Sequence, residues 1–245
     1  MKILVCISNV PDTTTKITFT PDGKSFNTAG VQFVINPYDE YALTRAIELK
    51  EAQGGTVTVL NVGEADTEPN IRKALAIGAD DAIRVNIKPT DAFLVAQQIA
   101  HYAKEGGYDL ILMGRESIDY NGFQVHGMVG ELMGIPTIAP AMKLDVNGST
   151  ATLEREIEGG KEIIEVALPL VASAQQPMSE PRIPNMRGIM TARTKPLQVV
   201  EPVGQEAKTS VQKYELPPAK SGVKMIPAEN AGELIKLLRN EAKVL

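Results

Sequence analysis

The chain has 245 residues, of which 43% are hydrophobic and 22% are charged. A length of this size predicts roughly 1.6 domains, and therefore one large domain with an appendage and a core that needs no disulfide. The formal net charge of −5 disfavours a general nucleic-acid binder, and the single cysteine excludes an intrachain disulfide or a cysteine-based metal centre.

The first predicted element is a strand over residues 2–8, because KILVCIS is a continuous apolar run of the kind that is buried on both faces of a sheet. The run is too short for a signal peptide. No segment approaches the roughly 18 uninterrupted apolar residues of a transmembrane helix. We therefore expect a cytoplasmic protein without membrane insertion.

A polar hairpin is predicted over residues 13–28, followed by a helix. Asn36 is expected to cap the N-terminus of this helix, and Pro37 suits its first position, where an N–H would lack a partner. Asp39 suits the positive end of the helix dipole. The helix is predicted to end at Gly54-Gly55.

Strands and helices then alternate along the chain. The predicted strands cover residues 56–62, 82–85 and 110–113, and the predicted helices cover residues 67–77, 91–104 and about 124–133. Strands separated by helices imply βαβ units, whose right-handed crossovers place helices on both faces of a sheet. The predicted fold class is α/β, with a doubly wound, mainly parallel sheet of the Rossmann-like nucleotide-binding type.

The pattern changes near residue 142. Turn signals at Asn147-Gly148 and Gly159-Gly160 separate alternating segments, which predicts an antiparallel meander added to the parallel sheet. The chain becomes proline-rich after residue 174 and ends in an amphipathic helix near residues 233–239. We expect three parts: a nucleotide-binding domain with the meander (1–175), a partner recognition loop with a short helix (176–197), and an extended C-terminal arm (198–245).

The sequence contains no self-contained active site. His101 lies within a predicted helix, and His126 lies in a glycine-rich turn where it can serve as a hydrogen-bonding group. Cys6 belongs to the first strand, where a small buried hydrophobic residue is expected. No P-loop, HExxH, GxSxG or EF-hand motif is present. We therefore expect a binding protein and no enzyme.

Four segments predict a nucleotide-binding crevice. In an open parallel sheet, ligands bind beyond the C-terminal ends of the strands, where the strand order reverses. Residues 6–9, 36–39, 61–63 and 114–128 should meet at this edge. The last segment is rich in glycine and leads into a helix whose free N–H groups favour a phosphate.

The segment LEREIEGGKEIIEVALPLVASA (153–174) contains an E-R-E-x-(D/E)-G-G-x-E motif, followed by Leu-Pro and a strand of small residues. It resembles the signature of the electron transfer flavoprotein β subunit. The continuation SEPRIPNMRGIMTARTKPL resembles that family's N-(E/K)-P-R recognition loop and the helix after it. KILVCISNVPD, INPYDEYAL and KALAIGADDAIRV match the family in the same order, so the resemblance covers essentially the whole chain.

The resemblance implies one subunit of an αβ heterodimer. FAD, held mainly by the α subunit, would take electrons from acyl-CoA and related dehydrogenases and pass them to a membrane quinone oxidoreductase or another acceptor. The β chain alone would do no redox chemistry and would bind AMP. Carried over by motif, the nucleotide site comprises Cys6, Asn36, Pro37, Tyr38, Asp39, Val62, Gly114, Arg115, Glu116, Ser117, Ile118, Asp119, Tyr120, Asn121, Gly122, Phe123, Gln124 and Val125.

The loop at residues 119–127 departs from both known types of the family. AMP-binding members resemble D-D-D-C-N-Q-T-G, whereas bifurcating members, which bind a second FAD there, resemble D-G-D-T-x-Q-V-G. This chain has DYNGFQVHG. Because D-G-D-T is absent, the resemblance favours AMP, and a second FAD is the alternative.

The recognition loop implies a set of docking residues. Met186 occupies the anchor position that enters a hydrophobic pocket on the dehydrogenase, and a flexible thioether suits several partners. Arg182 and Arg187 would orient acidic partner surfaces. Glu156 matches a position that pairs with an arginine of the α subunit's mobile flavin domain.

A different class of protein also uses this scaffold, namely a stand-alone protein that binds or hydrolyses adenine nucleotides. Such a protein needs a phosphate-handling motif of the G-x-x-x-x-G-[KS] or S-G-G-x-D-S type, and neither motif is present in the chain.

Overall fold

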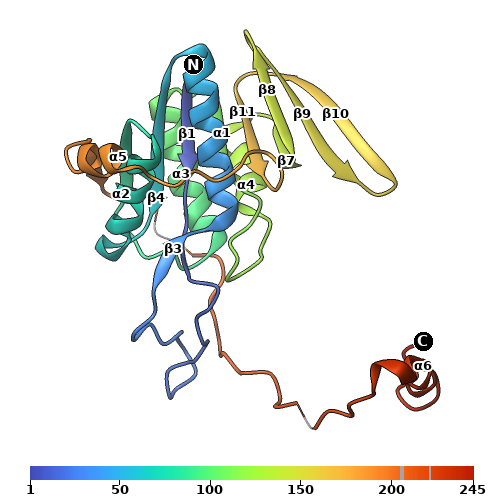
Figure 1. Ribbon diagram of the computed structural model, residues 1–245. Helices are drawn as coiled ribbons and strands as arrows, with labels where there is room; N and C mark the ends of the chain where they lie inside the picture. Colours follow the sequence, from blue (N-terminus) through green and yellow to red (C-terminus); the bar gives the residue numbers. More distant parts are fainter. Residues whose placement is uncertain (205–206, 221) are drawn as a thin grey trace. The chain divides into compact units, whose positions relative to one another are not determined.

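The structure is a computed structural model that describes residues 1–204, 207–220 and 222–245. The chain divides into two units, the larger formed by residues 1–17 and 27–212 and the smaller by residues 18–26 and 213–245. A parallel sheet of seven strands forms the centre of the larger unit, in the order β12-β5-β4-β1-β6-β11-β7 (Figure 1). Its strands are β1 (Lys2–Cys6), β4 (Thr56–Val62), β5 (Asp81–Val85), β6 (Leu110–Gly114), β7 (Thr137–Ala141), β11 (Leu170–Ala174) and β12 (Leu197–Val200).

Helices cover both faces of this sheet, which confirms the predicted doubly wound α/β fold. On one face, α1 (Pro37–Gln53) and α2 (Glu68–Ile77) bury Leu43 and Leu75 in the same apolar cluster as Val5 of β1. On the other face, α3 (Ala92–Gly106) and α4 (Val125–Met133) pack with Leu4 and the other residues of a second cluster. A short 3₁₀ turn, η1 (Ala65–Thr67), precedes α2, and α5 (Met186–Ala192) lies beside α2 (Figure 1).

The strand order reverses between β1 and β6. From β1 the chain proceeds through β4 to β5 on one side, and then returns to place β6 on the other side of β1. The C-terminal ends of β1 and β6 therefore border the crevice in which sheets of this type bind ligands.

The predicted antiparallel meander is present, but it forms a sheet of its own. Strands β8 (Lys143–Asn147), β9 (Thr150–Ile157) and β10 (Gly160–Ala167) pair only with one another within the described part of the chain (Figure 1). The next segment, β11, returns to the main sheet as a parallel strand between β6 and β7. Its five residues are all buried, which is typical of a central parallel strand.

The N-terminal hairpin differs from its prediction. The antiparallel ladder lies outside residues 13–28 and joins β2 (Asn9–Pro11) to β3 (Phe33–Ile35). Among the described residues of the range 13–28, the strand pairing consists of one isolated bridge, between Phe19 and Phe26. Polar side chains bind some of the backbone groups there in place of a neighbouring strand. For example, the Asp22 carboxylate accepts a hydrogen bond from the N–H of Lys24 at 3.1 Å.

Strand β12 was not predicted. Residues 198–245 were expected to form the C-terminal arm, whereas Leu197–Val200 pair with β5 in the structure. The chain then continues along α3, where the N–H of Val203 donates to the side chain of Gln98 at 2.8 Å. The arm therefore separates from the sheet later than the proline content suggested.

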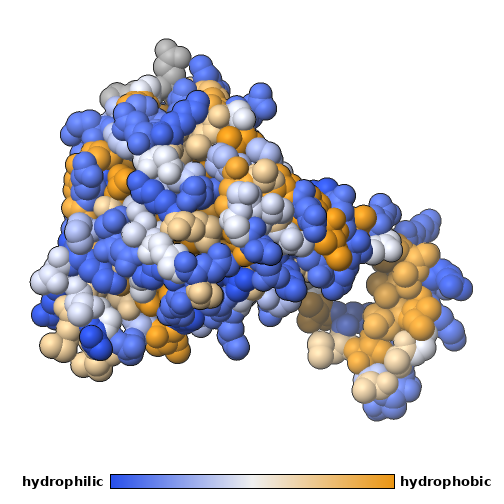
Figure 2. All heavy atoms as spheres, turned by 90° about the horizontal axis from the view of Figure 1, so that it is seen from above, coloured by the Kyte–Doolittle hydropathy of each residue, from blue (hydrophilic) through white to orange (hydrophobic). Residues whose placement is uncertain are grey.

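The smaller unit contains the end of the arm. The rings of Phe19 and Tyr214 stack with their centroids 5.0 Å apart, and the N–H of Tyr214 donates to the carbonyl of Gly23 at 2.7 Å. A turn, η2 (Ala228–Asn230), leads into α6 (Ala231–Asn240), which confirms the predicted terminal helix. Apolar side chains gather over α6 (Figure 2). Among the described residues, no helix is both long and apolar enough to span a bilayer.

Candidate nucleotide-binding site

The side chain of Asn36, at the start of α1, holds the loop that follows β6. Its Nδ2 group donates to the carbonyl of Glu116 at 2.9 Å, and its Oδ1 atom accepts from the N–H of Ile118 at 3.2 Å. The prediction that this side chain caps α1 is wrong, because it makes no cap hydrogen bond. Pro37 has no N–H, so the first turn of α1 has one donor fewer that needs a partner. The buried side-chain amide of Asn36 holds the loop instead of capping the helix.

Asp39 connects the ends of β1 and β6 from the same turn of α1. Its carboxylate is buried and accepts from the N–H of Ser8 at 2.6 Å and from the N–H of Gly114 at 2.8 Å. Burial raises the pKa of this carboxyl group to about 6, although hydrogen bonds from Ser8, Asn36 and Gly114 favour the ionised form. Asp39 was predicted to lie at the positive end of the helix dipole. The structure shows that it also links the ends of two strands by hydrogen bonds.

Gly114 is required at the end of β6. A Cβ atom there would lie 2.4 Å from Oδ1 of Asp39 and 2.6 Å from Cβ of Tyr38. Only glycine lets the strand end this close to the first turn of α1.

The loop from Arg115 to Gln124 follows this anchor, and its residues 119–124 are exposed. Asn121 and Phe123 have φ angles of +49° and +50°, which residues with a Cβ adopt rarely. The loop leads into α4, whose first turn receives no side-chain cap from Gln124. The N–H groups of that turn and the helix dipole favour an anion at this point.

Cys6 and Val62 are apolar residues at the C-terminal ends of β1 and β4. Both are buried in the cluster beneath α3 and α4. Burial, and to a smaller degree the charge of Asp39, raises the pKa of the Cys6 thiol. The thiol therefore stays protonated and packs as a small apolar group, in agreement with the sequence analysis.

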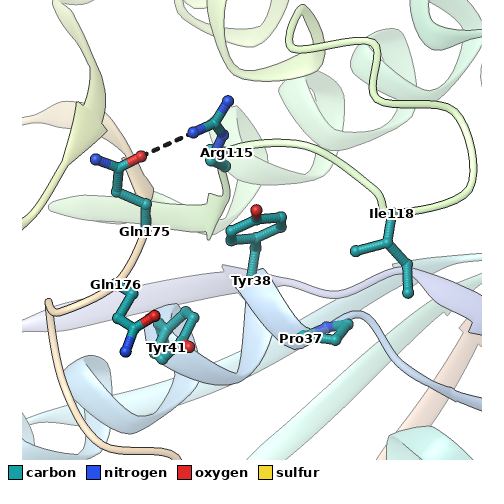
Figure 3. A pocket seen from close by; sticks show the side chains of 7 residues that line it. All are labelled: Pro37, Tyr38, Tyr41, Arg115, Ile118, Gln175 and Gln176. Atoms are coloured by element: carbon teal, nitrogen blue, oxygen red, sulfur yellow. Dashed lines mark hydrogen bonds between the residues drawn. The ribbon is translucent and has the colours of Figure 1, made fainter. Parts of the chain in front are cut away.

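A separate pocket of about 320 Å³ opens on the α1 side of the loop (Figure 3). The guanidinium of Arg115 lies between the rings of Tyr38 and Phe123, 5.6 Å and 5.5 Å from their centroids. It also donates to the side-chain oxygen of Gln175 at 2.9 Å. Tyr41 and Gln176 complete the polar lining (Figure 3).

The structure thus brings together most of the predicted nucleotide residues, but over two surfaces. Pro37, Tyr38, Arg115 and Ile118 line the pocket, whereas Cys6 and Val62 lie in the cluster of the opposite face. Sequence reasoning missed Tyr41, Gln175 and Gln176. The two glutamines directly follow β11, and they would have been found had this segment been identified as a parallel strand that ends at the same edge of the sheet.

The recognition loop is fixed at both ends. The hydroxyl of Ser179 donates to the carbonyl of Tyr41 at 2.8 Å. Asn185 caps α5 by accepting from the N–H of Gly188 at 2.8 Å. At Gly188 a Cβ atom would lie 2.2 Å from the carbonyl oxygen of Ala76, so α5 packs directly on α2.

The predicted docking residues differ in their availability. Met186 is 74% exposed, and Arg187 is also exposed. Arg182, in contrast, makes a bidentate ion pair with Glu51 at 2.8 Å and is engaged within the chain. Sequence reasoning missed Ile183, which is 92% exposed between Arg182 and a proline. Its position between these residues in a short loop was the available signal.

Glu156 lies on β9, opposite Lys161 of β10, and is exposed. The amine of Lys161 contacts Glu154 of the same hairpin, and Glu156 makes only a smaller electrostatic contribution to raising the pKa of this amine. The carboxylate of Glu156 is therefore accessible at the surface of the three-stranded sheet.

Residues 24–203 match the family model described as "Electron transfer flavoprotein domain". The chain is 41% identical to the electron transfer flavoprotein subunit beta of Bacillus subtilis (strain 168), over 100% of both chains. It is 34% identical to that of Bradyrhizobium diazoefficiens over 100% of both chains. It is 32% identical to that of Homo sapiens over 100% of this chain and 99% of the relative. These similarities confirm the resemblance seen in the sequence motifs.

We expect Asp39→Asn to remove part of the pH dependence of stability. The pKa of Asp39 is about 6 in the folded chain, whereas an aspartate in the unfolded chain has its ordinary pKa of about 3.8. The free energy of unfolding of the wild type should therefore rise by about 1 kcal/mol from this group between about pH 7.5 and pH 5. At pH 7.5 the variant should be less stable, because one amide oxygen cannot replace both carboxylate oxygens.

Urea denaturation at the two pH values measures this difference, with Asp66→Asn at an exposed position as the matched control. Equal pH slopes in the wild type and in Asp39→Asn would show that the Asp39 pKa is not raised.

Proposed function

Because the chain belongs to the electron transfer flavoprotein β-subunit family, we propose that it is the β subunit of a heterodimer that carries electrons from acyl-CoA and related dehydrogenases to a membrane quinone oxidoreductase or another acceptor. The observation that carries this proposal is the nucleotide loop held by Asn36 and Asp39 next to the first turn of α4. The chain itself binds and docks, and it has no redox step of its own. We propose a cytoplasmic location for the heterodimer.

AMP is the proposed nucleotide of the loop. The exposed backbone of residues 119–124 can approach a phosphate, and the first turn of α4 favours its charge. The absence of a D-G-D-T sequence supports AMP over a second FAD. The FAD that exchanges electrons is proposed to be held mainly by the α subunit, with Tyr38 facing its ring.

The C-terminal arm is the proposed contact with the α subunit. Along α6, Leu234 and Ile235 are 46% and 53% exposed, and Leu237 and Leu238 are partly exposed. An amphipathic helix with an uncovered apolar side gains free energy when another chain covers it. Glu156 is proposed to pair with an arginine of the α subunit's flavin domain.

The recognition loop is the proposed contact with the dehydrogenase. Ile183 and Met186 project from a segment whose ends are anchored on α1 and α2, and Met190 of α5 is 69% exposed beside them. A loop that is ordered before binding loses little conformational entropy on association. We therefore propose Ile183 together with Met186 as the anchors, where the sequence alone indicated Met186.

Denaturing the purified heterodimer should release AMP and FAD in equal amounts, as identified by mass spectrometry. Two equivalents of FAD without AMP would identify the bifurcating type. Release of no nucleotide other than the FAD of the α subunit would contradict the proposed site. The chain expressed without the α subunit should show no flavin absorption, and dye reduction by this chain alone would favour a stand-alone protein.

We expect Ile183→Ala and Met186→Ala each to raise the half-saturating concentration of heterodimer in a dehydrogenase-coupled assay by about tenfold. Burying such a side chain contributes about 1.5–3 kcal/mol, and a tenfold change in affinity corresponds to about 1.4 kcal/mol. Flavin content and the free energy of unfolding should stay unchanged, because both side chains are outside the core.

Ile163→Ala is the matched control, because Ile163 is 71% exposed on β10, away from the recognition loop. The loop would not be part of the docking surface if the half-saturating concentration changed equally in the control and in both variants. The same conclusion would follow if it changed in none of them.

A further inference from the structure

His126 occupies the first turn of α4 and faces the sheet. It is 5% exposed and lies on the same side of the helix as Val129 and Gly130, which are also buried. Val129 packs in one cluster with Met113 of β6 and Val171 of β11. The imidazole therefore lies over the C-terminal ends of these strands, next to the crevice.

The imidazole has unused hydrogen-bonding capacity. Neither ring nitrogen has a hydrogen-bond partner among the described residues, although the ring packs edge-on against Phe123 at 4.7 Å. Burial lowers the pKa of His126, and the backbone of Arg115 offsets this effect in part without reaching hydrogen-bond geometry. At pH 7 the ring is neutral and offers one N–H donor and one acceptor.

A second unpartnered polar atom lies on the same face of the sheet. The hydroxyl of Ser173 on β11 is fully buried and has no hydrogen-bond partner among the described residues. Because side chains alternate along a strand, Ser173 faces the same way as Val171, toward α4. Ser173 is in register with Met113, one residue before Gly114. Buried polar groups without partners are rare in folded proteins, so two of them here indicate a missing ligand.

The first turn of α4 shows which chemistry fits. The N–H of Met128 donates to the carbonyl of Gln124, so the N–H groups of residues 125–127 precede the first helical hydrogen bond. Nothing lies within 4 Å of the position that a Cβ atom would occupy at Gly127, which leaves the backbone open to a close approach. Donors of this kind at a helix N-terminus suit a phosphate group.

We propose that the ring N–H of His126 donates a hydrogen bond to the phosphate of the bound nucleotide, which makes His126 a nucleotide-binding residue beyond the loop of residues 114–125. This inference rests on the proposed nucleotide site. The competing explanation is a buried water molecule bound to the imidazole, in which case His126 is a structural residue.

The test compares AMP with adenosine, which lacks the phosphate. Both are titrated into heterodimer freed of its nucleotide, with the wild-type chain and with His126→Leu, which keeps most of the side-chain volume. The affinity for AMP should fall by about tenfold or more, and the affinity for adenosine should stay unchanged. His126→Gln should recover part of the loss, and His101→Leu, at a partly exposed position of α3, should have no effect. An equal loss for AMP and adenosine, or no loss, would overturn the proposal.

A measurement on the wild type covers the case in which His126→Leu does not fold. The chain contains two histidines, so ¹⁵N-histidine labelling of this chain alone gives two sets of ring signals in the heterodimer. AMP should shift the ring ¹⁵N signals of His126 and leave those of His101 in place, and adenosine should shift neither. Ring signals of His126 that respond equally to AMP and adenosine would overturn the proposal.

The identity of the bound nucleotide and the role of His126 are tested separately. If the wild type binds FAD instead of AMP, the nucleotide assignment fails, and the comparison of FAD with riboflavin decides the role of His126 by the same criterion. If the wild type binds neither AMP nor FAD at this site, the proposed nucleotide site and the role of His126 are both contradicted.

Discussion

The ends of β1 and β6 and the loop after β6 depend on four hydrogen bonds between backbone atoms and two buried side chains, Asn36 directly before α1 and Asp39 in its first turn. Asn36 and Asp39 reach as far as Ile118, 82 positions along the chain, and fix the ends of β1 and β6 against the first turn of the helix. Because these four bonds end on backbone atoms, they do not depend on the identity of the loop side chains that they reach. Residues 119–124, which follow these bonds and precede α4, are exposed.

The sequence predicted the parts of the fold whose pattern is local. The strand at residues 56–62 has the predicted bounds, and the helices around it begin and end within a few residues of their predicted positions. Strand β12 was missed because two of its four residues are exposed and the other two are only partly buried, so that its place in the sheet is set by pairing with β5. The strand at residues 170–174 was assigned to the meander because the turns before it are antiparallel, whereas its direction is decided by its neighbours in the main sheet.

In the site, several residues named from the sequence make contacts other than those expected. Asn36 was expected as a helix cap, since a cap is a local role, but its partners are distant backbone atoms. Arg182 was expected to face a partner, and its engagement with Glu51 depends on the packing of the loop against α1. Ile183 was missed because its only sequence signal was its place between an arginine and a proline, and the structure shows that it is 92% exposed. Tertiary contacts decide each of these roles.

Hydrogen exchange of the Ser8, Gly114 and Ile118 amides, measured before and after nucleotide addition, tests most directly whether α1 preforms the site. These three N–H groups donate to Asp39 and Asn36 in the chain without ligand. They should therefore be protected from exchange in the nucleotide-free protein, and Asn36→Ala should accelerate exchange at Ile118. Amides that exchange freely until the nucleotide is added would show that the ligand, and not the first turn of α1, orders the loop.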